Sequence, residues 1–290
     1  MAPGDAGGVV SDTGATGPTS VWAAEAKLTV SLRVTGVRPD GYHLLDAEMV
    51  TVDLADTLEL TQCDPADAGL EVTCEWPDGT GAWRDLGVGD PADNLVTRAL
   101  GAVGRSARAR LVKRIPPGAG LGGGSADAAA VLRWAGVDDP TVAASIGADV
   151  PFCVRGGRAR VTGIGERVQP LGHLDRGVVL LLPPFGVDTA AVYRAYDRLA
   201  AEGRRMDAGT GGNDLEVAAL VVEPRLAVWR DALAEATGRV PRLAGSGSTW
   251  FVDGDAAALG VGGRRWVEVE GQRAPLVGAR TTPGGAAVLR

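Results

Sequence analysis

The 290-residue sequence contains few lysines, few cysteines and few aromatic residues. Of its 29 basic residues only Lys27 and Lys113 are lysines and the other 27 are arginines, so each lysine is worth inspecting. The three cysteines are odd in number and lack metal or redox spacing, as expected for reduced thiols in a cytoplasm. Aromatic residues make up 4% of the chain, so few side chains are available to stack on a planar ligand.

Further absences exclude whole classes of protein. No run of about 18 apolar residues is present, so we expect no membrane span. The net charge of −7 has no basic run to offset it, which argues against a nucleic-acid partner. Residues 1–20 have neither an apolar segment nor a positive cluster, so we predict a disordered extension and not a signal peptide. With 45% hydrophobic residues, the chain is long enough for two globular domains.

Glycine, by contrast, is concentrated in one stretch. Five of the seven residues from Gly118 to Gly124 are glycines, and a loop without side chains can close its backbone N–H groups around an anion. Strong helix sequence follows until Gly136, with Ser125 expected as its N-cap. A glycine loop before a helix N-terminus favours phosphate binding. The alternative, a plain glycine-rich turn, is less favoured because ordering five glycines costs considerable entropy.

Three kinds of phosphate loop are compatible with glycine-rich sequence. A P-loop needs a lysine within the loop, and none is present. Gly118 to Gly123 has the dinucleotide-binding spacing, but that fingerprint follows a hydrophobic strand, and Lys113 to Pro117 is not one. The third kind is the loop Pro-x3-Gly-Leu-Gly-(Gly/Ser)-(Gly/Ser)-Ser-Ala of the GHMP kinases, a superfamily of small-molecule kinases. Pro116 to Ala126 closely resembles it.

The segment Ala26 to Val34 alternates strictly between polar and apolar residues, which predicts a half-buried strand. Its polar face displays Lys27 and Thr29 together. For an isolated strand, such a face is usually exposed to solvent. A turn follows that presents Tyr42 and His43.

Asp149 lies between Gly147 and the apolar run Val-Pro-Phe. A carboxylate in this position is either a cap or turn residue, or a base held in a partly dry site. The sequence also predicts other elements: a capped helix from Pro91 to Val103, strands at 110–115, 156–171 and 178–182, helices at 189–201 and 224–236, and a Gly/Ser loop at 243–250.

A narrower resemblance covers the chain from Ala23 to the C-terminus. The segment Lys27 to Leu60, and above all its Asp-Gly-Tyr-His element, resembles the opening of the 4-diphosphocytidyl-2-C-methylerythritol kinase family within the GHMP superfamily. The Gly-Ala-Asp-Val-Pro-Phe string around Asp149 matches that family's catalytic segment. Thr29 departs from the family, which usually has Asn there, so a polar substrate contact is altered.

The resemblance implies an α+β fold of two domains. Residues 21–172 would form the N-terminal ATP-binding domain and residues 173–290 a ferredoxin-like C-terminal domain, with the active site between them. The implied protein is a cytoplasmic monomer or homodimer. It would use ATP and Mg²⁺ to phosphorylate a small molecule, the cytidyl substrate, on its 2-hydroxyl.

The same resemblance assigns roles to individual residues. Asp149 would be the base that accepts the hydroxyl proton, and Lys27 would keep Asp149 ionised. Ser125 would reach a phosphate oxygen or Mg²⁺. The residues expected to bind ATP are Pro117, Gly118, Ala119, Gly120, Leu121, Gly122, Gly123, Gly124, Ser125 and Asp127. Those expected to bind the substrate are Thr29, Tyr42, His43, Tyr193, Gly245, Ser246 and Gly247.

Three alternatives remain open at this level. One is another kinase of the superfamily, of the homoserine or mevalonate type, which would share the loop but not Asp-Gly-Tyr-His. A second is a dinucleotide-binding oxidoreductase, based on the spacing at Gly118. A third is a nucleotide-binding module without catalytic activity. For Tyr193 alone, a place on the core face of a helix is as good an interpretation as ligand binding.

Overall fold

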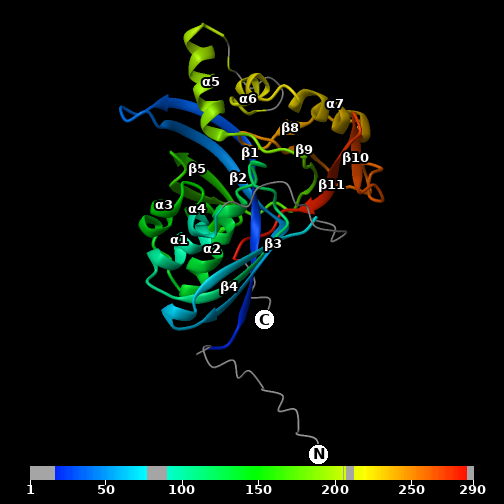
Figure 1. The fold of residues 1–290 in the computed structure, drawn as a ribbon. Helices are drawn as coiled ribbons and strands as arrows, with labels where there is room; N and C mark the ends of the chain where they lie inside the picture. The colour runs from blue at the N-terminus through cyan, green and yellow to red at the C-terminus, as the bar shows by residue number, and fades with distance from the viewer. Residues whose placement is uncertain (1–16, 77–89, 205, 207–211, 286–290) are drawn as a thin grey trace, which may run out of the picture.

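A computed structural model describes residues 17–76, 90–204, 206 and 212–285 of the chain (Figure 1). It is a mixed α+β structure with two sheets, as predicted. Most of the predicted extension lies outside the described residues. Ser20, which we had placed in that extension, already belongs to the first strand, where it pairs with Leu60. No helix among the described residues is long and apolar enough to cross a membrane.

The first sheet has six strands in the order β3-β4-β2-β5-β6, with β1 paired to β2. Both β1 and β2 are long, so together they form the extended hairpin that projects at one side of Figure 1. The strands are β1 Ser20–Val37, β2 His43–Gln62, β3 Gly69–Cys74, β4 Ala107–Lys113, β5 Arg158–Gly163 and β6 Arg167–Leu171.

The second sheet has five strands in the order β10-β11-β7-β9-β8. Its strands are β7 Gly177–Leu181, β8 Arg242–Leu243, β9 Trp250–Asp253, β10 Trp266–Val269 and β11 Gln272–Arg280. The two sheets come together at the end of β11, where Thr282 N–H donates to Thr51 O on β2 at 2.9 Å. The first sheet uses strands up to residue 171 and the second begins at residue 177. A domain boundary near residue 173 stays a prediction.

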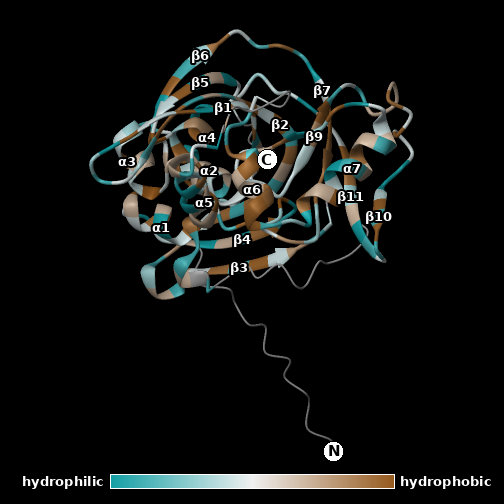
Figure 2. Cartoon of the chain, turned by 90° about the horizontal axis from the view of Figure 1, so that it is seen from above, coloured by the Kyte–Doolittle hydropathy of each residue, from teal (hydrophilic) through white to brown (hydrophobic). Residues whose placement is uncertain are grey.

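Helices cover the two sheets separately. On the first sheet, α2 (Gly123–Ala135) contacts β1 and packs among α1 (Leu95–Ala102), α3 (Pro140–Ile146) and α4 (Val150–Arg155). On the second sheet, α7 (Leu226–Thr237) contacts β9 and β10, and α6 (Glu216–Val222) packs against α7 and α5 (Thr189–Ala201). Two short 3-10 turns, Pro65–Asp67 and Pro91–Asp93, complete the described elements. Hydrophobic residues concentrate on strands and inward helix faces, while hydrophilic residues dominate the outer turns (Figure 2).

Local signals located most helices correctly. Helix α5 has the predicted bounds, because Asp188 caps its first turn by accepting from Ala190 N–H at 2.9 Å. Helix α2 ends at Gly136 as predicted, but it begins at Gly123, so Ser125 is not its N-cap. Gly122 takes that position with a φ of 65°, a left-handed conformation that glycine adopts without strain.

Strand β1 is longer and less regular than the alternation predicted. Its register with β2 shifts between Glu25 and Lys27, and again between Thr29 and Ser31. Such irregularities re-aim side chains locally. Lys27, Leu28 and Thr29 are all buried, because the glycine loop lies against the strand here and Lys27 N–H donates to Leu121 O.

Candidate active site

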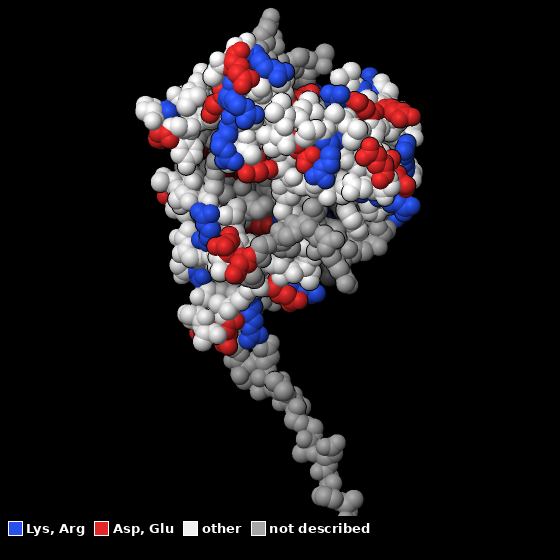
Figure 3. Space-filling view, turned by 45° about the horizontal axis from the view of Figure 1, so that its top comes forward, with Lys and Arg blue, Asp and Glu red and all other residues white. Residues whose placement is uncertain are grey.

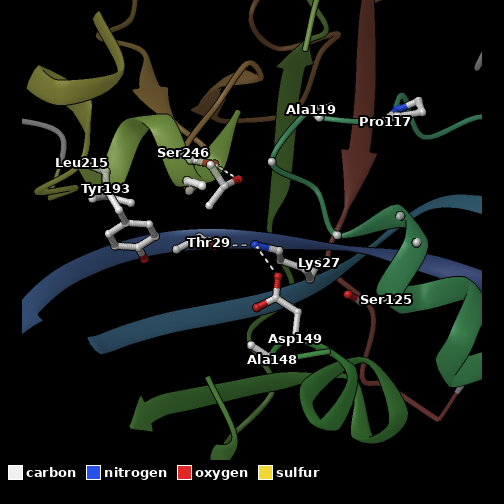
Figure 4. Close-up of a pocket in the computed structure, with 18 of the residues that line it drawn as sticks. Lys27, Thr29, Pro117, Ala119, Ser125, Ala148, Asp149, Tyr193, Leu215 and Ser246 are labelled. Carbon is white, nitrogen blue, oxygen red and sulfur yellow. Dashed lines mark hydrogen bonds and ion pairs between the residues drawn. The ribbon is translucent and has the colours of Figure 1, made fainter. Parts of the chain in front are cut away.

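A cavity of about 920 Å³ lies where β1, the glycine loop, α5 and the loop after β8 converge. Figure 4 shows residues of the glycine loop on one side of it and Tyr193 on the other, with Lys27 and Asp149 between them. All predicted site residues line this cavity except Leu121 and Gly247. The side chain of Leu121 is 1% exposed and belongs to the core, and Gly247 packs against Leu243, so neither presents a side chain to a ligand.

Lys27 and Asp149 form an ion pair at the centre of the cavity. Lys27 Nζ lies 3.1 Å from Asp149 Oδ2, with 8% and 29% of the two side chains exposed. Asp149 occupies the N-cap position of α4, yet its carboxylate accepts no capping hydrogen bond. Asp149 is thus a turn residue that does not cap the helix with its side chain. Its carboxylate lines the cavity, where it pairs with Lys27.

Packing around Lys27 fixes the direction of its side chain. Its backbone N–H donates to Leu121 O at 3.0 Å, which ties β1 to the glycine loop. The aliphatic stem lies across Gly122, where an added Cβ would be 2.7 Å from Lys27 Cγ. Lys27 Nζ also donates to Thr29 Oγ1 at 3.3 Å, so the polar pair predicted on this strand acts together. The ammonium is thus held at the level of the loop.

The glycine loop docks backbone to backbone against the Gly/Ser loop after β8. Ala119 O accepts from Thr249 N–H at 3.0 Å. Gly120 has a φ of 79°, and a Cβ there would lie 2.2 Å from Ala244 O. Glycine is therefore required at this position by both conformation and space. The two loops behave as one unit.

Asn213 supports the Gly/Ser loop from beneath. Its Nδ2 donates to Leu243 O at 2.9 Å and to Gly245 O at 2.7 Å, and the residue is 3% exposed. A Cβ on Gly245 would lie 3.7 Å from Lys27 Nζ, so this loop forms part of the centre of the site. Asn213 also precedes α6 (Glu216–Val222), where a polar residue is typical of a helix cap. Its role in the loop depends on a contact across about 30 residues, which local pattern does not reveal.

The far end of the cavity is aromatic. The ring of His43 stacks on Tyr193 with centroids 4.6 Å apart, and His43 Nε2 lies 2.7 Å from Asp197 Oδ1. Tyr193 both packs against the core and lines the cavity, so its two interpretations are compatible. Burial, with a smaller contribution from Asp149, raises the pKa of the Tyr193 hydroxyl, which therefore stays neutral. Tyr42 is 59% exposed at the rim.

A second buried ion cluster lies beneath the glycine loop, and no pattern in the sequence had indicated it. Lys113 Nζ contacts Asp56 and lies 2.7 Å from Asp127 Oδ2. Burial raises the pKa of Asp127, although the ammonium of Lys113 opposes that rise. For Lys113 burial favours the neutral form, but the two carboxylates outweigh it and raise the pKa of the ammonium. The scarcity of lysine was the signal that could have found this cluster.

Protein side chains alone do not build a metal site here. Within the described part of the chain, no group of three or more His, Cys, Asp or Glu residues is placed to hold a metal ion. Mg²⁺ usually binds through one or two protein oxygens together with substrate phosphates, and Ser125 is the residue that the sequence predicts to reach it. The hydroxyl of Ser125 lies 3.9 Å from the position of a Cβ on Gly147, so it faces the turn that carries Asp149.

Comparison with known proteins agrees with this geometry. The family "GHMP kinases N terminal domain" matches residues 94–157. A solved mevalonate kinase shares the fold, with a TM-score of 0.51 at 11% identity over 90% of this chain and 98% of that one. Fold and site therefore define a small-molecule kinase of the GHMP class.

Closer relatives narrow the class. The 4-diphosphocytidyl-2-C-methyl-D-erythritol kinase of Paracoccus denitrificans is 38% identical over 246 residues, covering 79% of this chain and 85% of that protein. A crystal structure of 4-(cytidine 5'-diphospho)-2C-methyl-D-erythritol kinase is 31% identical with a TM-score of 0.64, covering 91% and 99%. The chain belongs to the 4-diphosphocytidyl-2-C-methyl-D-erythritol kinase family.

Proposed function

We propose that this protein transfers the γ-phosphoryl group of ATP to the 2-hydroxyl of 4-diphosphocytidyl-2-C-methyl-D-erythritol, a step of non-mevalonate isoprenoid synthesis. Family membership supports the substrate. The observation that carries the chemistry is the Lys27–Asp149 pair, held at the meeting point of two glycine-rich loops. Phosphoryl transfer needs mainly positioning and charge stabilisation from a protein, and this arrangement supplies both.

Asp149 is the base in this proposal. Its uncapped carboxylate accepts the proton of the acceptor hydroxyl, and Lys27 Nζ, 3.1 Å away, holds that carboxylate in place. Lys27 also stabilises negative charge on the transferring phosphoryl group. Thr29 holds Lys27 from one side and Gly122 leaves room for its stem on the other.

The glycine loop and the first turn of α2 bind the phosphates of ATP. Backbone N–H groups at the start of this helix have no intrahelical partner and point toward a bound anion, which the helix dipole also favours. When Mg²⁺ is bound it neutralises phosphate charge, and Ser125 is the side chain that we infer to hold it. Asp127 is buried against Lys113, so its part in ATP binding is indirect.

The aromatic end of the cavity receives the cytosine. Tyr193 and His43 already stack on each other, so they present a flat apolar surface with polar edges, and Tyr42 stands at the rim. A small molecule whose base lies here places its hydroxyl toward Asp149, because both ends line the same cavity. Acidic and basic side chains are interspersed on the surface shown in Figure 3, which suits a small-molecule substrate better than nucleic acid.

The topology excludes the dinucleotide-binding alternative. That fingerprint requires a helix connecting two neighbouring parallel strands. Here the chain passes from α2 through α3 and α4 to β5, which pairs antiparallel with β2. Kinases of the homoserine or mevalonate type act on acceptors without a cytidyl group. They are the second candidate function for this chain. A monomeric or dimeric state and a cytoplasmic location stay predictions.

A phosphate-transfer assay tests the proposed function. Purified protein is incubated with ATP and, separately, the cytidyl acceptor, homoserine and mevalonate. We expect turnover with the cytidyl acceptor alone. Asp149→Asn serves as the site variant and Asp138→Asn, an exposed residue remote from the cavity, as the matched control that retains activity. Turnover of homoserine or mevalonate, or ATP binding without turnover of any acceptor, would overturn the proposal.

A further inference from the structure

The two ends of the glycine loop lie side by side, and a buried ion cluster joins them. The loop leaves β4 after Lys113 and enters α2 at Gly123. A Cβ on Gly123 would lie 2.9 Å from the side chain of Ile115 and 3.0 Å from Lys113 Nζ. The loop is therefore closed at a narrow neck, as in compact Ω-loops. Whatever holds the neck sets the shape of the loop.

Asp56 holds the first side of the neck. It lies on β2 with a side chain that is 0% exposed. Its Oδ1 accepts from the backbone N–H groups of Arg114 and, at 2.8 Å, of Ile115. Its Oδ2 accepts from Lys113 Nζ. The chain is therefore anchored to the sheet at the residues where it leaves β4.

Asp127 holds the second side. It is the fifth residue of α2, and its Oδ2 accepts from Lys113 Nζ at 2.7 Å. Its other oxygen, Oδ1, is buried without a hydrogen-bond partner among the described residues. One ammonium thus faces two carboxylates, and all three side chains are at most 5% exposed. Removing the ammonium would leave both buried carboxylates unpaired, so the lysine is costly to lose.

We propose that Lys113 is a positioning residue for ATP, which clasps the neck of the glycine loop by bridging Asp56 on β2 to Asp127 on α2. This inference rests on the proposed function. Lys113 and Asp127 also line the cavity, so the clasp lies directly beneath the surface that receives the phosphates. Because a displacement of about 1 Å in a reactant can cost roughly 10²-fold in rate, a loosened neck is expected to impair ATP use.

The choice of lysine supports this role. In a chain with 27 arginines, both lysines line one cavity, each paired with an aspartate. An ammonium is a compact point charge with three donors, whereas guanidinium is planar and larger. Because a Cβ built on Gly123 would lie only 3.0 Å from Lys113 Nζ, the neck has little room for the larger arginine head group. Lys113→Arg should therefore keep the charge but spread the neck.

Two variants separate positioning from simple structural support. Asp127→Asn retains the shape of the side chain and leaves Lys113 paired with Asp56, so the thermal midpoint is expected to equal or exceed that of the wild type. The Kd of a non-hydrolysable ATP analogue should rise roughly tenfold, because a neutral hydrogen bond holds the neck less firmly and part of the binding energy is then used to close it. Lys113→Arg should lower kcat/KM for ATP by about 10²-fold. In both, KM for the cytidyl acceptor should stay within about twofold.

The experiment is steady-state kinetics on both substrates, calorimetric binding of the ATP analogue, and thermal unfolding, with Asp138→Asn as the control. Unchanged ATP parameters in folded Asp127→Asn and Lys113→Arg proteins would overturn the clasp while leaving the proposed function standing. Equal losses in kcat/KM for ATP and for the acceptor, together with a lower thermal midpoint, would also overturn the clasp. A wild type that binds the analogue but phosphorylates no cytidyl acceptor would instead overturn the proposed function.

Discussion

Lys27 Nζ lies 3.1 Å from Asp149 Oδ2 across the cavity between β1 and α4, although the two residues are far apart in the chain. The lysine comes from a bulged strand and the aspartate from the uncapped start of a helix. The aspartate does not cap its helix, and both side chains line the cavity. Their shared position is what makes the cavity a candidate for phosphoryl transfer.

Replacing Asp149 by Asn should remove the base while keeping the size of the side chain. We expect turnover to fall by ~10²–10⁴-fold, with ATP affinity nearly intact because the phosphates bind at the other loop. Single-turnover kinetics and analogue binding on the same preparation test this. Near-normal turnover in the folded variant would rule out the proposed base.

Lys27→Arg tests whether a compact ammonium is required. The stem of Lys27 lies against Gly122, so a longer side chain with a planar head cannot place its charge at the same point. We expect a folded protein with turnover reduced by about 10²-fold, the loss associated with misplacement by about 1 Å. Full activity would indicate that the pair with Asp149 is only an ordinary ion pair.

Gly120→Ala tests the docking of the two loops. An added methyl group would meet Ala244 O at 2.2 Å, so the loops must separate. We expect kcat/KM for ATP to fall by about 10²-fold. Gly101→Ala is the matched control, because Gly101 lies in α1 with open space around its Cα, and there the change should stabilise by ~0.5–1 kcal/mol. Equal kinetics in the two variants would argue against a docked loop pair.

Tyr193→Leu tests the aromatic end of the cavity. Cytidine 5′-diphosphate should inhibit the wild type competitively with the acceptor and not with ATP, since the stacked pair His43–Tyr193 lies away from the glycine loop. Loss of one stacking ring should weaken that inhibition by ~1–3 kcal/mol. The KM for ATP is the internal control. Competition of the nucleotide with ATP alone would place the cytosine elsewhere.

Cys153 should make stability depend on pH in the alkaline range. Burial, and next the negative charge of Asp149, raise the pKa of this thiol from 9.0 to about 12. Between these values the unfolded chain releases the proton and the folded protein does not, so stability is fully present below pH 9 and falls as the pH rises toward 12. The slope is at most ~1.4 kcal/mol per pH unit.

Cys153→Ala should remove that slope. Urea unfolding of wild type and variant at pH 8 and pH 10 measures it, and the difference between the two proteins at each pH cancels other groups that titrate in the same range. Loss of the sulfur atom changes the free energy of unfolding by the same amount at both pH values, so it does not affect this comparison. Parallel stabilities at the two pH values would contradict the assignment.

The sequence by itself determined the elements whose signals are local. Asp188 caps the helix from Thr189 to Ala201, and Gly136 ends α2, so these bounds followed from neighbouring residues. Asp149 and the glycine loop could also be detected in the sequence. A carboxylate beside an apolar run is costly to bury, and a cluster of five glycines is costly to order. Ser125 was placed wrongly as a cap, since Gly122 could adopt the left-handed conformation that starts the helix earlier.

Only the tertiary structure decided which side chains act together. Lys113 meets Asp56 across 57 residues and Asn213 reaches Gly245 across 32, and neither pair leaves a periodic or capping pattern in the sequence. The burial of Lys27 likewise depends on the glycine loop, whose Gly122 lies against the lysine stem, and alternation of polar and apolar residues does not encode that contact. The physical reason is that pattern reports the preferences of adjacent residues, whereas the position of a buried charge is set by the partners that strand pairing and helix packing bring to it.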